Sequence, residues 1–172
     1  MIRPAKTADI AAICAIYSEI FAQERAGENY TQWIEGVYPT AATAEKALEA
    51  GTMYVLEEGG EALASVILNS FQPAEYAEIP WLYPAEGEEA LVIHTLCVSP
   101  RAAGRGLATK LIEFACGFAY GRGAKVIRLD TNAKNAPARR LYLRNGWRLA
   151  GSHRALHEGV LDTELVYLER AL

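Results

Sequence analysis

Residues 91–106 have the sequence LVIHTLCVSPRAAGRG. The first half of this stretch is an apolar run that predicts a buried strand, and Pro100 ends it because proline has no N–H for the ladder. The Gly104/Gly106 turn follows, and residues 107–122 then carry apolar side chains at helical spacing. A strand that leads into a helix through such a turn presents backbone N–H groups at the positive end of the helix dipole. The stretch therefore predicts an anion site, and phosphate is the usual ligand.

Three kinds of phosphate-binding turn can be compared with this stretch. A P-loop requires Gly-x-x-x-x-Gly-Lys-Ser/Thr, which the sequence lacks here. A dinucleotide fingerprint requires Gly-x-Gly-x-x-Gly. Gly104 and Gly106 supply two of these glycines, Thr109 replaces the third, and Asp130 lies at a plausible distance for a ribose-binding acid. The third pattern, Gln/Arg-x-x-Gly-x-Gly/Ala, is matched at every fixed position by residues 101–106.

The next segment agrees with the third pattern. Residues 125–131 predict a second strand, and the following helix has Asn135 as a good N-cap and Gly146 as a good terminating residue. Pro137 lies in the first turn of this helix, where proline is tolerated. Tyr142, seven residues after Asn135, is on the same helix face.

These features resemble the GCN5-related N-acetyltransferase (GNAT) family. The resemblance consists of the loop, the helix, the second strand and the Asn-x-x-Ala-x-x-Leu-Tyr helix in one order, and it covers an acetyl-coenzyme A core from about Leu91 to Trp147. It implies an α/β fold with one domain over residues 1–172. The sheet would be mixed and mostly antiparallel, with about six or seven strands, helices on both faces, and a central parallel pair that splays to admit the cofactor.

The resemblance also implies which residues hold acetyl-coenzyme A. Backbone groups of residues 96–98 would pair with the pantetheine arm, and amides of residues 101–108 would receive the pyrophosphate, with added contacts from the two arginines. The alternative is a purely structural turn with solvated arginines. The expected cofactor positions are Leu96, Cys97, Val98, Arg101, Ala103, Gly104, Arg105, Gly106, Leu107, Ala108, Asn135, Ala138 and Tyr142.

Two residues are candidates for the chemistry. By the same resemblance, Tyr142 would hydrogen-bond the departing thiolate, since full proton transfer from a tyrosine with a pKa near 10 to a thiolate is uphill. The alternative is a tyrosine that only packs. His94 could take the proton of the amine, or it could be a satisfied histidine within the sheet. The reserve candidates for the base are Glu75, Glu78 and the acidic run 86–89.

The acceptor side can be read only from composition. Aromatic residues with nearby glutamates could form a wall for an ammonium group through cation–π contact, or they could be buried anchors of solvent-facing loops. In the family these loops border the acceptor. The candidates are Tyr30, Trp33, Trp81 and Tyr83.

Composition excludes several other classes. The net charge of −4 argues against nucleic acid as a partner, and the chain has neither a membrane-length apolar run nor a signal peptide, which predicts the cytoplasm. The three cysteines lack metal-ligand spacing, so they are predicted to pack. His153 and His157, beside Glu158, fall at a predicted hairpin turn and favour a solvated loop, so no metal site is expected. A homodimer is common in the resembled family.

The remaining elements follow from periodicity and turn residues. A strand over 1–5 precedes a helix that Thr7 would cap, with Asp9 in its first turn. That helix has an apolar stripe of Ile10, Ile13, Cys14, Tyr17, Ile20 and Phe21. A short helix is expected at 43–50, hairpins at 53–57 with 62–69 and at 147–153 with 161–169, and a long connection at 71–89.

The leading functional hypothesis is acetyl transfer from acetyl-coenzyme A to a primary amine of a small molecule or peptide, by direct attack in a ternary complex. A non-catalytic acyl-coenzyme A-binding module is the second hypothesis. A nicotinamide-dependent oxidoreductase is the third, and Thr109 in place of glycine counts against it.

Overall fold

The computed structural model describes residues 1–157 and 161–172. Its strands are β1 (Ile2–Pro4), β2 (Met53–Glu58), β3 (Glu61–Asn69), β4 (Ala90–Val98), β5 (Val126–Asn132), β6 (Arg148–His157) and β7 (Leu161–Ala171). Its α-helices are α1 (Ile10–Ala26), α2 (Ala41–Glu49), α3 (Leu107–Gly121) and α4 (Ala136–Arg144). Short 3-10 turns cover Thr7–Asp9, Ala74–Glu78, Gly87–Glu89 and Pro100–Ala102.

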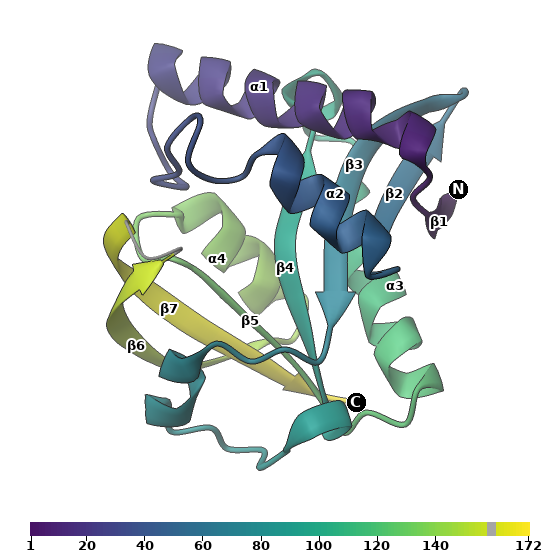
Figure 1. Cartoon of the computed structure of the whole chain (residues 1–172). Helices are drawn as coiled ribbons and strands as arrows, with labels where there is room; N and C mark the ends of the chain where they lie inside the picture. Colours follow the sequence, from purple (N-terminus) through teal and green to yellow (C-terminus); the bar gives the residue numbers. More distant parts are fainter. Residues whose placement is uncertain (158–160) are drawn as a thin grey trace. The chain divides into compact units, whose positions relative to one another are not determined.

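The strands form a mixed sheet in the order β1-β2-β3-β4-β5-β7-β6 (Figure 1). β4 and β5 are parallel, and their register runs from Ala90 opposite Val126 to Ile93 opposite Leu129. The pairs β1–β2, β2–β3, β5–β7 and β6–β7 are antiparallel. The predicted mixed, mostly antiparallel α/β sheet is therefore confirmed. No helix in the described part of the chain is long and apolar enough to span a membrane.

Contacts divide the chain into two compact units. The first comprises Met1–Asn29, Trp33–Leu68 and His94–Phe114, and the second comprises Tyr30–Gln32, Asn69–Ile93 and Ala115–Leu172.

The first unit is built on the β2–β3 hairpin. Gly59 and Gly60 both have positive φ, as a two-residue hairpin turn requires, so the predicted hairpin forms where expected. One face of the hairpin packs against α1 and α2, through alternate residues such as Met53 and Val55. Tyr54, between them, points to the opposite face and meets Phe114 of α3 at 5.3 Å between ring centroids. Helices therefore cover both faces of this part of the sheet (Figure 1).

The start of α1 differs from the prediction. Thr7 begins a 3-10 turn and does not cap α1, which starts at Ile10 with Asp9 in the N-cap position. The Asp9 carboxylate does not bond the helix; it accepts hydrogen bonds from the Lys6 N–H at 2.7 Å and from Arg3 at 2.7 and 2.9 Å. Arg3 also donates to Glu57 on β2. The capping prediction is wrong because residues 7–9 form a 3-10 turn ahead of α1, so Thr7 lies three residues before the first residue of the helix.

The Arg3–Asp9 pair predicts a pH-dependent stability. Hydrogen bonding to Arg3 lowers the pKa of Asp9 from its ordinary value, so the pair stabilises the fold above the unfolded-state pKa near 4 and is lost as the pH falls through the folded-state pKa. We expect Asp9→Asn to lower the Tm by about 2–4 °C at pH 7. In thermal unfolding at pH 7, 5 and 3, the gap between variant and wild type should shrink towards pH 3. Glu113→Gln, which removes an exposed carboxylate, should leave the Tm unchanged; an equal gap at all three pH values would contradict the linkage.

The second unit contains the antiparallel set β5–β7–β6 and α4. The long connection between β3 and β4 lies in this unit and contributes Tyr76 and Ile79 to its core, beside Val92, Leu165 and Tyr167. β6 begins as predicted but extends beyond His153 to His157, because its pairing with β7 continues past that residue. This antiparallel register, rather than the local apolar pattern, sets the strand length.

Candidate active site

β4 supplies the strand expected to lie beside the cofactor. Cys97 is buried and packs in the core formed by α1, α2 and β2, and its burial raises the pKa of the thiol. Leu96 and Val98 are half-buried. Cys14, on α1, likewise has a pKa raised by burial. Packing is thus the observed role of Cys97, and neither thiol is poised as a nucleophile.

Thr95 has an unusual backbone conformation within β4. Its φ is +47°, a value that is rare for a β-branched residue and that costs free energy. The Thr95 hydroxyl is hydrogen-bonded to the Tyr38 hydroxyl, and both residues are buried. Sequence analysis did not single out Tyr38 or Thr95. The irregularity falls one residue before Leu96, where a bulge would change the side-chain alternation of the strand.

The Tyr38–Thr95 hydrogen bond predicts an energetic coupling. In Tyr38→Phe the buried Thr95 hydroxyl loses this partner, so we expect the free energy of unfolding to fall by about 1–3 kcal/mol in urea titrations. Thr95→Val keeps the side-chain shape and removes the other half of the bond. The double variant should be less destabilised than the sum of the two single variants, by about 1 kcal/mol. Strict additivity would show that the two hydroxyls do not support each other.

The turn between β4 and α3 has the conformation that the glycines suggested. Gly104 and Gly106 have φ of +76° and +74°, and a Cβ built on either residue would meet no other atom within 4 Å. The turn begins with the 3-10 segment, in which the Ala103 N–H donates to the Pro100 carbonyl at 3.1 Å. The Ala103 amide is therefore used within the turn, as is the Ala102 amide, which donates to the Ser99 carbonyl at 2.8 Å. The amides of Arg101 and of residues 104–108 stay candidate anion donors. Leu107 begins α3, whose first-turn N–H groups have no partner within the helix.

Both arginines of the turn form surface ion pairs. Arg101 donates to Glu19 at 2.8 Å and to Glu61 at 2.9 Å, and Arg105 donates to Glu58. Their side chains stay about half exposed, at 58% and 50%. Pairs as exposed as these contribute little to stability, so either guanidinium can exchange its carboxylate for a phosphate at low cost.

Glu19 on α1 also holds the strand end of the turn. Its carboxylate accepts a hydrogen bond from Ser99 Oγ as well as from Arg101, and the Ser99 N–H donates to the Leu63 carbonyl at 2.8 Å. The turn is thereby tied to both α1 and β3. Nothing in the local pattern around Glu19 indicates this role, because its partners are about 80 residues away.

In the second unit, α4 carries the remaining candidate residues. The Asn135 side chain accepts a hydrogen bond from the Ala138 N–H at 3.1 Å, so Asn135 is the N-cap as predicted. Gly146 ends the helix with φ of +78°. Tyr142 is buried, 6% exposed, with its ring edge-on to Trp147 at 5.3 Å between centroids. The motif therefore forms a capped helix that orients a buried tyrosine.

The candidate bases differ in their surroundings. His94 is half-buried on β4, directly before Thr95. Glu75 is half-buried and Glu78 exposed, both in the 3-10 turn that begins at Ala74. In the acidic run 86–89, the Glu88 carboxylate accepts hydrogen bonds from Ser70 and Arg122, and the Glu89 carboxylate accepts one from Lys125. The assignment of His94 as base stays a prediction.

The four aromatic acceptor candidates fall into two groups. Trp33 belongs to the first unit, where it borders a pocket of about 280 Å³ that Glu24 and Glu35 also line. Tyr30, Trp81 and Tyr83 belong to the second unit. The guanidinium of Arg128 lies over the Trp81 ring, 4.3 Å from the centroid, so a cation of the protein already occupies that face. Trp33 is thus the candidate whose pocket is lined by two carboxylates, Glu24 and Glu35.

His153 and His157 lie on β6 and not at the predicted hairpin turn, because the strand continues to His157. His153 lies on β6 and is half-buried. Glu158 lies outside the described residues, as does the side chain of His157. Within residues 1–157 and 161–172, no three histidine, cysteine, aspartate or glutamate residues gather as metal ligands would.

Comparison with known proteins agrees with this geometry. Residues 11–147 match the acetyltransferase (GNAT) family. The chain is 31% identical over 150 residues to YhfO, an uncharacterised N-acetyltransferase of Bacillus subtilis, and the match covers 85% of this chain and 88% of that protein. It is 42% identical to a streptothricin acetyltransferase of Escherichia coli, but over 59 residues, which are 34% of each chain.

Solved structures show the same fold. A GNAT-family acetyltransferase of Streptococcus agalactiae superposes with a TM-score of 0.84, at 20% identity, over 100% of this chain and 95% of that one. A ribosomal-protein-alanine N-acetyltransferase of Brucella melitensis gives a TM-score of 0.74 at 21% identity, over 100% and 99% of the two chains. At these identities the likeness concerns the fold. The chain belongs to the acetyltransferase (GNAT) family, as the family match over most of its length shows. It is an enzyme of the N-acetyltransferase class.

Proposed function

We propose that the protein transfers an acetyl group from acetyl-coenzyme A to a primary amine, by direct attack within a ternary complex. The observation that carries the proposal is the β4–α3 turn, in which two glycines of positive φ precede the first amides of a helix and leave open space beside the backbone. Such a turn suits a diphosphate, because unpaired N–H groups and the helix dipole act on the same anion. The pantetheine arm would then run along residues 96–98 of β4.

Direct attack is favoured over a covalent acyl-enzyme. A cysteine nucleophile acts as the thiolate, and burial disfavours that form for both Cys97 and Cys14. Tyr142 is the group proposed to hydrogen-bond the departing thiolate of coenzyme A, and His94 is the base proposed to accept the proton of the attacking ammonium. Both roles follow from the resemblance to the family and from the positions of these residues on α4 and β4.

A cationic acceptor is the substrate class that we propose. Trp33, Glu24 and Glu35 border one pocket in the first unit, and this combination of an aromatic ring with carboxylates attracts an ammonium group. Arg25 also lines the pocket and pairs with Glu35. Streptothricin is a candidate acceptor because one relative is named a streptothricin acetyltransferase.

The test is thiol release from acetyl-coenzyme A across a panel of acceptors. The panel contains streptothricin, a diamine, single amino acids and a peptide with a free N-terminus, and mass spectrometry identifies any acetylated product. We expect amine-dependent release with at least one member and acetylation at nitrogen. Binding of acetyl-coenzyme A without release for any amine would instead support the non-catalytic acyl-coenzyme A-binding module. Absence of acetyl-coenzyme A binding by well-folded protein would refute both.

A further inference from the structure

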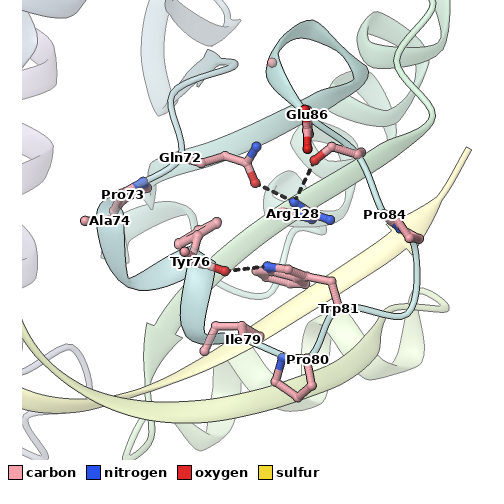
Figure 2. A pocket seen from close by; sticks show the side chains of 13 residues that line it. Gln72, Pro73, Ala74, Tyr76, Ile79, Pro80, Trp81, Pro84, Glu86 and Arg128 are labelled. Carbon is pink, nitrogen blue, oxygen red and sulfur yellow. Dashed lines mark hydrogen bonds between the residues drawn. The ribbon is translucent and has the colours of Figure 1, made fainter.

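Arg128 is a buried cation in the middle of β5. Arg128 is only 3% exposed, and its neighbours in the strand, Ile127 and Leu129, are apolar. Its guanidinium donates through Nη1 to Gln72 Oε1 and to the Ala85 carbonyl at 3.4 Å, and through Nη2 to the Tyr83 carbonyl at 2.7 Å. All three acceptors are neutral and lie on the connection between β3 and β4 (Figure 2).

Arg128 has no carboxylate as an ion-pair partner among the described residues. The acid opposite it in the β5–β7 register is Glu169, which attracts Arg128 through space. Glu169 is fully buried and is used elsewhere: it accepts from Arg148 at 2.7 Å and from the backbone N–H groups of Leu82 at 2.8 Å and Tyr83 at 3.4 Å. Buried charges in proteins are normally paired or hydrogen-bonded to the full, and the Arg128 Nε–H has no acceptor in the described structure.

The guanidinium borders a pocket of about 650 Å³, a volume typical of small-molecule sites. The pocket is lined mainly by rings and small apolar side chains, including Tyr76 and Trp81 (Figure 2). Ala77 also lines it. The Trp81 ring lies against the guanidinium, and its Nε1–H donates to the Tyr76 carbonyl at 2.8 Å. The pocket therefore combines an apolar wall with one cation that retains hydrogen-bond donors.

We propose that this pocket binds a small organic carboxylate, with its apolar body against Trp81 and its carboxylate on Arg128. The three protein acceptors leave the Nε–H, which is itself buried, and one Nη2–H of Arg128 without a partner in the described structure. A guanidinium binds carboxylate and phosphate alike, so the apolar wall is what favours an organic carboxylate over inorganic phosphate, which has no apolar body to place against it. Glu86 also lines the pocket, but it is exposed, so water and salt screen its repulsion more than they screen the buried Arg128. The site belongs to the second unit and does not depend on the function proposed above.

The experiment uses the full chain, with the indole N–H resonance of Trp81 as the reporter in ¹H–¹⁵N NMR titrations, assigned by Trp81→Phe. The probes are phenylacetate, indole-3-acetate and hexanoate, each with its neutral amide, and inorganic phosphate. We expect at least one carboxylate to shift the Trp81 resonance saturably, and its amide to bind about tenfold or more weakly.

Four variants, one of them the control Arg144→Gln, locate the binding. Arg128→Gln should lower the affinity for the carboxylate by about tenfold or more. Arg144→Gln, which removes an exposed arginine, should leave that affinity unchanged. Ala77→Trp fills the pocket from an exposed position and leaves Arg128 in place, so it should abolish binding even if Arg128→Gln does not fold. Glu86→Gln removes the repelling charge and should bind the carboxylate as tightly as wild type or more tightly.

Each contrary result would overturn the proposal. These results are no saturable shift with any carboxylate, equal affinity for the amides, equal affinity for phosphate, or unchanged carboxylate binding in Ala77→Trp. The last would place the binding at another part of the surface.

Discussion

Tyr142→Phe should lower kcat by about a hundredfold or more while leaving the affinity for acetyl-coenzyme A within about threefold. The reason is that the hydroxyl is proposed to act on sulfur only as negative charge develops there, so its loss raises the barrier and not the ground-state energy. The ring itself should stay in place, because it is buried and packs on Trp147. The measurement is steady-state kinetics with the best amine of the panel, together with calorimetry of acetyl-coenzyme A binding.

The matched control is Tyr120→Phe. Tyr120 lies on α3 and is 74% exposed, and its substitution removes the same hydroxyl group. It should leave both kcat and affinity unchanged. If Tyr142→Phe turns over at the wild-type rate while chemistry limits the reaction, Tyr142 has no part in the departure of the thiolate.

Gly106→Ala should lower the affinity for acetyl-coenzyme A by about tenfold to a hundredfold. Two effects contribute. A φ of +74° is strained for alanine by about 1–2 kcal/mol, and the new methyl group would stand where the diphosphate is proposed to approach the backbone. A Cβ at this position meets no protein atom within 4 Å, so any extra loss of affinity must come from the ligand and not from a clash inside the protein.

Gly51→Ala separates the two effects. Gly51 has φ of +69°, also has open space around it, and is not one of the expected cofactor positions. Both variants should lose a similar free energy of unfolding in urea, whereas only Gly106→Ala should lose cofactor affinity. Equal calorimetric affinities in the two variants would mean that the turn is structural and does not bind the diphosphate.

Sequence reasoning located most elements of the fold because their signals are local. The turn glycines at 59–60, the N-cap Asn135 and the helix-ending Gly146 act within a few residues, and each has the expected conformation. The apolar run 91–98 became β4 for the same reason. The prediction for Thr7 was wrong because a 3-10 turn over Thr7–Asp9, in which the Lys6 N–H donates to the Asp9 carboxylate, precedes α1.

Other features depend on residues far apart in the chain. Tyr38 and Thr95 are 57 positions apart, and no local pattern pairs their hydroxyls. Sequence analysis did not single out Arg128, whose environment depends on how the connection between β3 and β4 packs on β5. The Trp81 ring was expected to be available to a substrate cation, and Arg128 covers one of its faces.

The sequence by itself determined the strand–turn–helix core, the capped helix that carries Tyr142 and the family to which these belong, because backbone conformation and hydrophobic periodicity are properties of short segments. Tertiary structure decided which charges are buried and which hydroxyls meet: Glu169 pairs with Arg148, and Arg128 faces neutral carbonyls beside a pocket. Those pairings follow from strand register and long-range packing, since a buried charge acquires its partners only when distant segments come together.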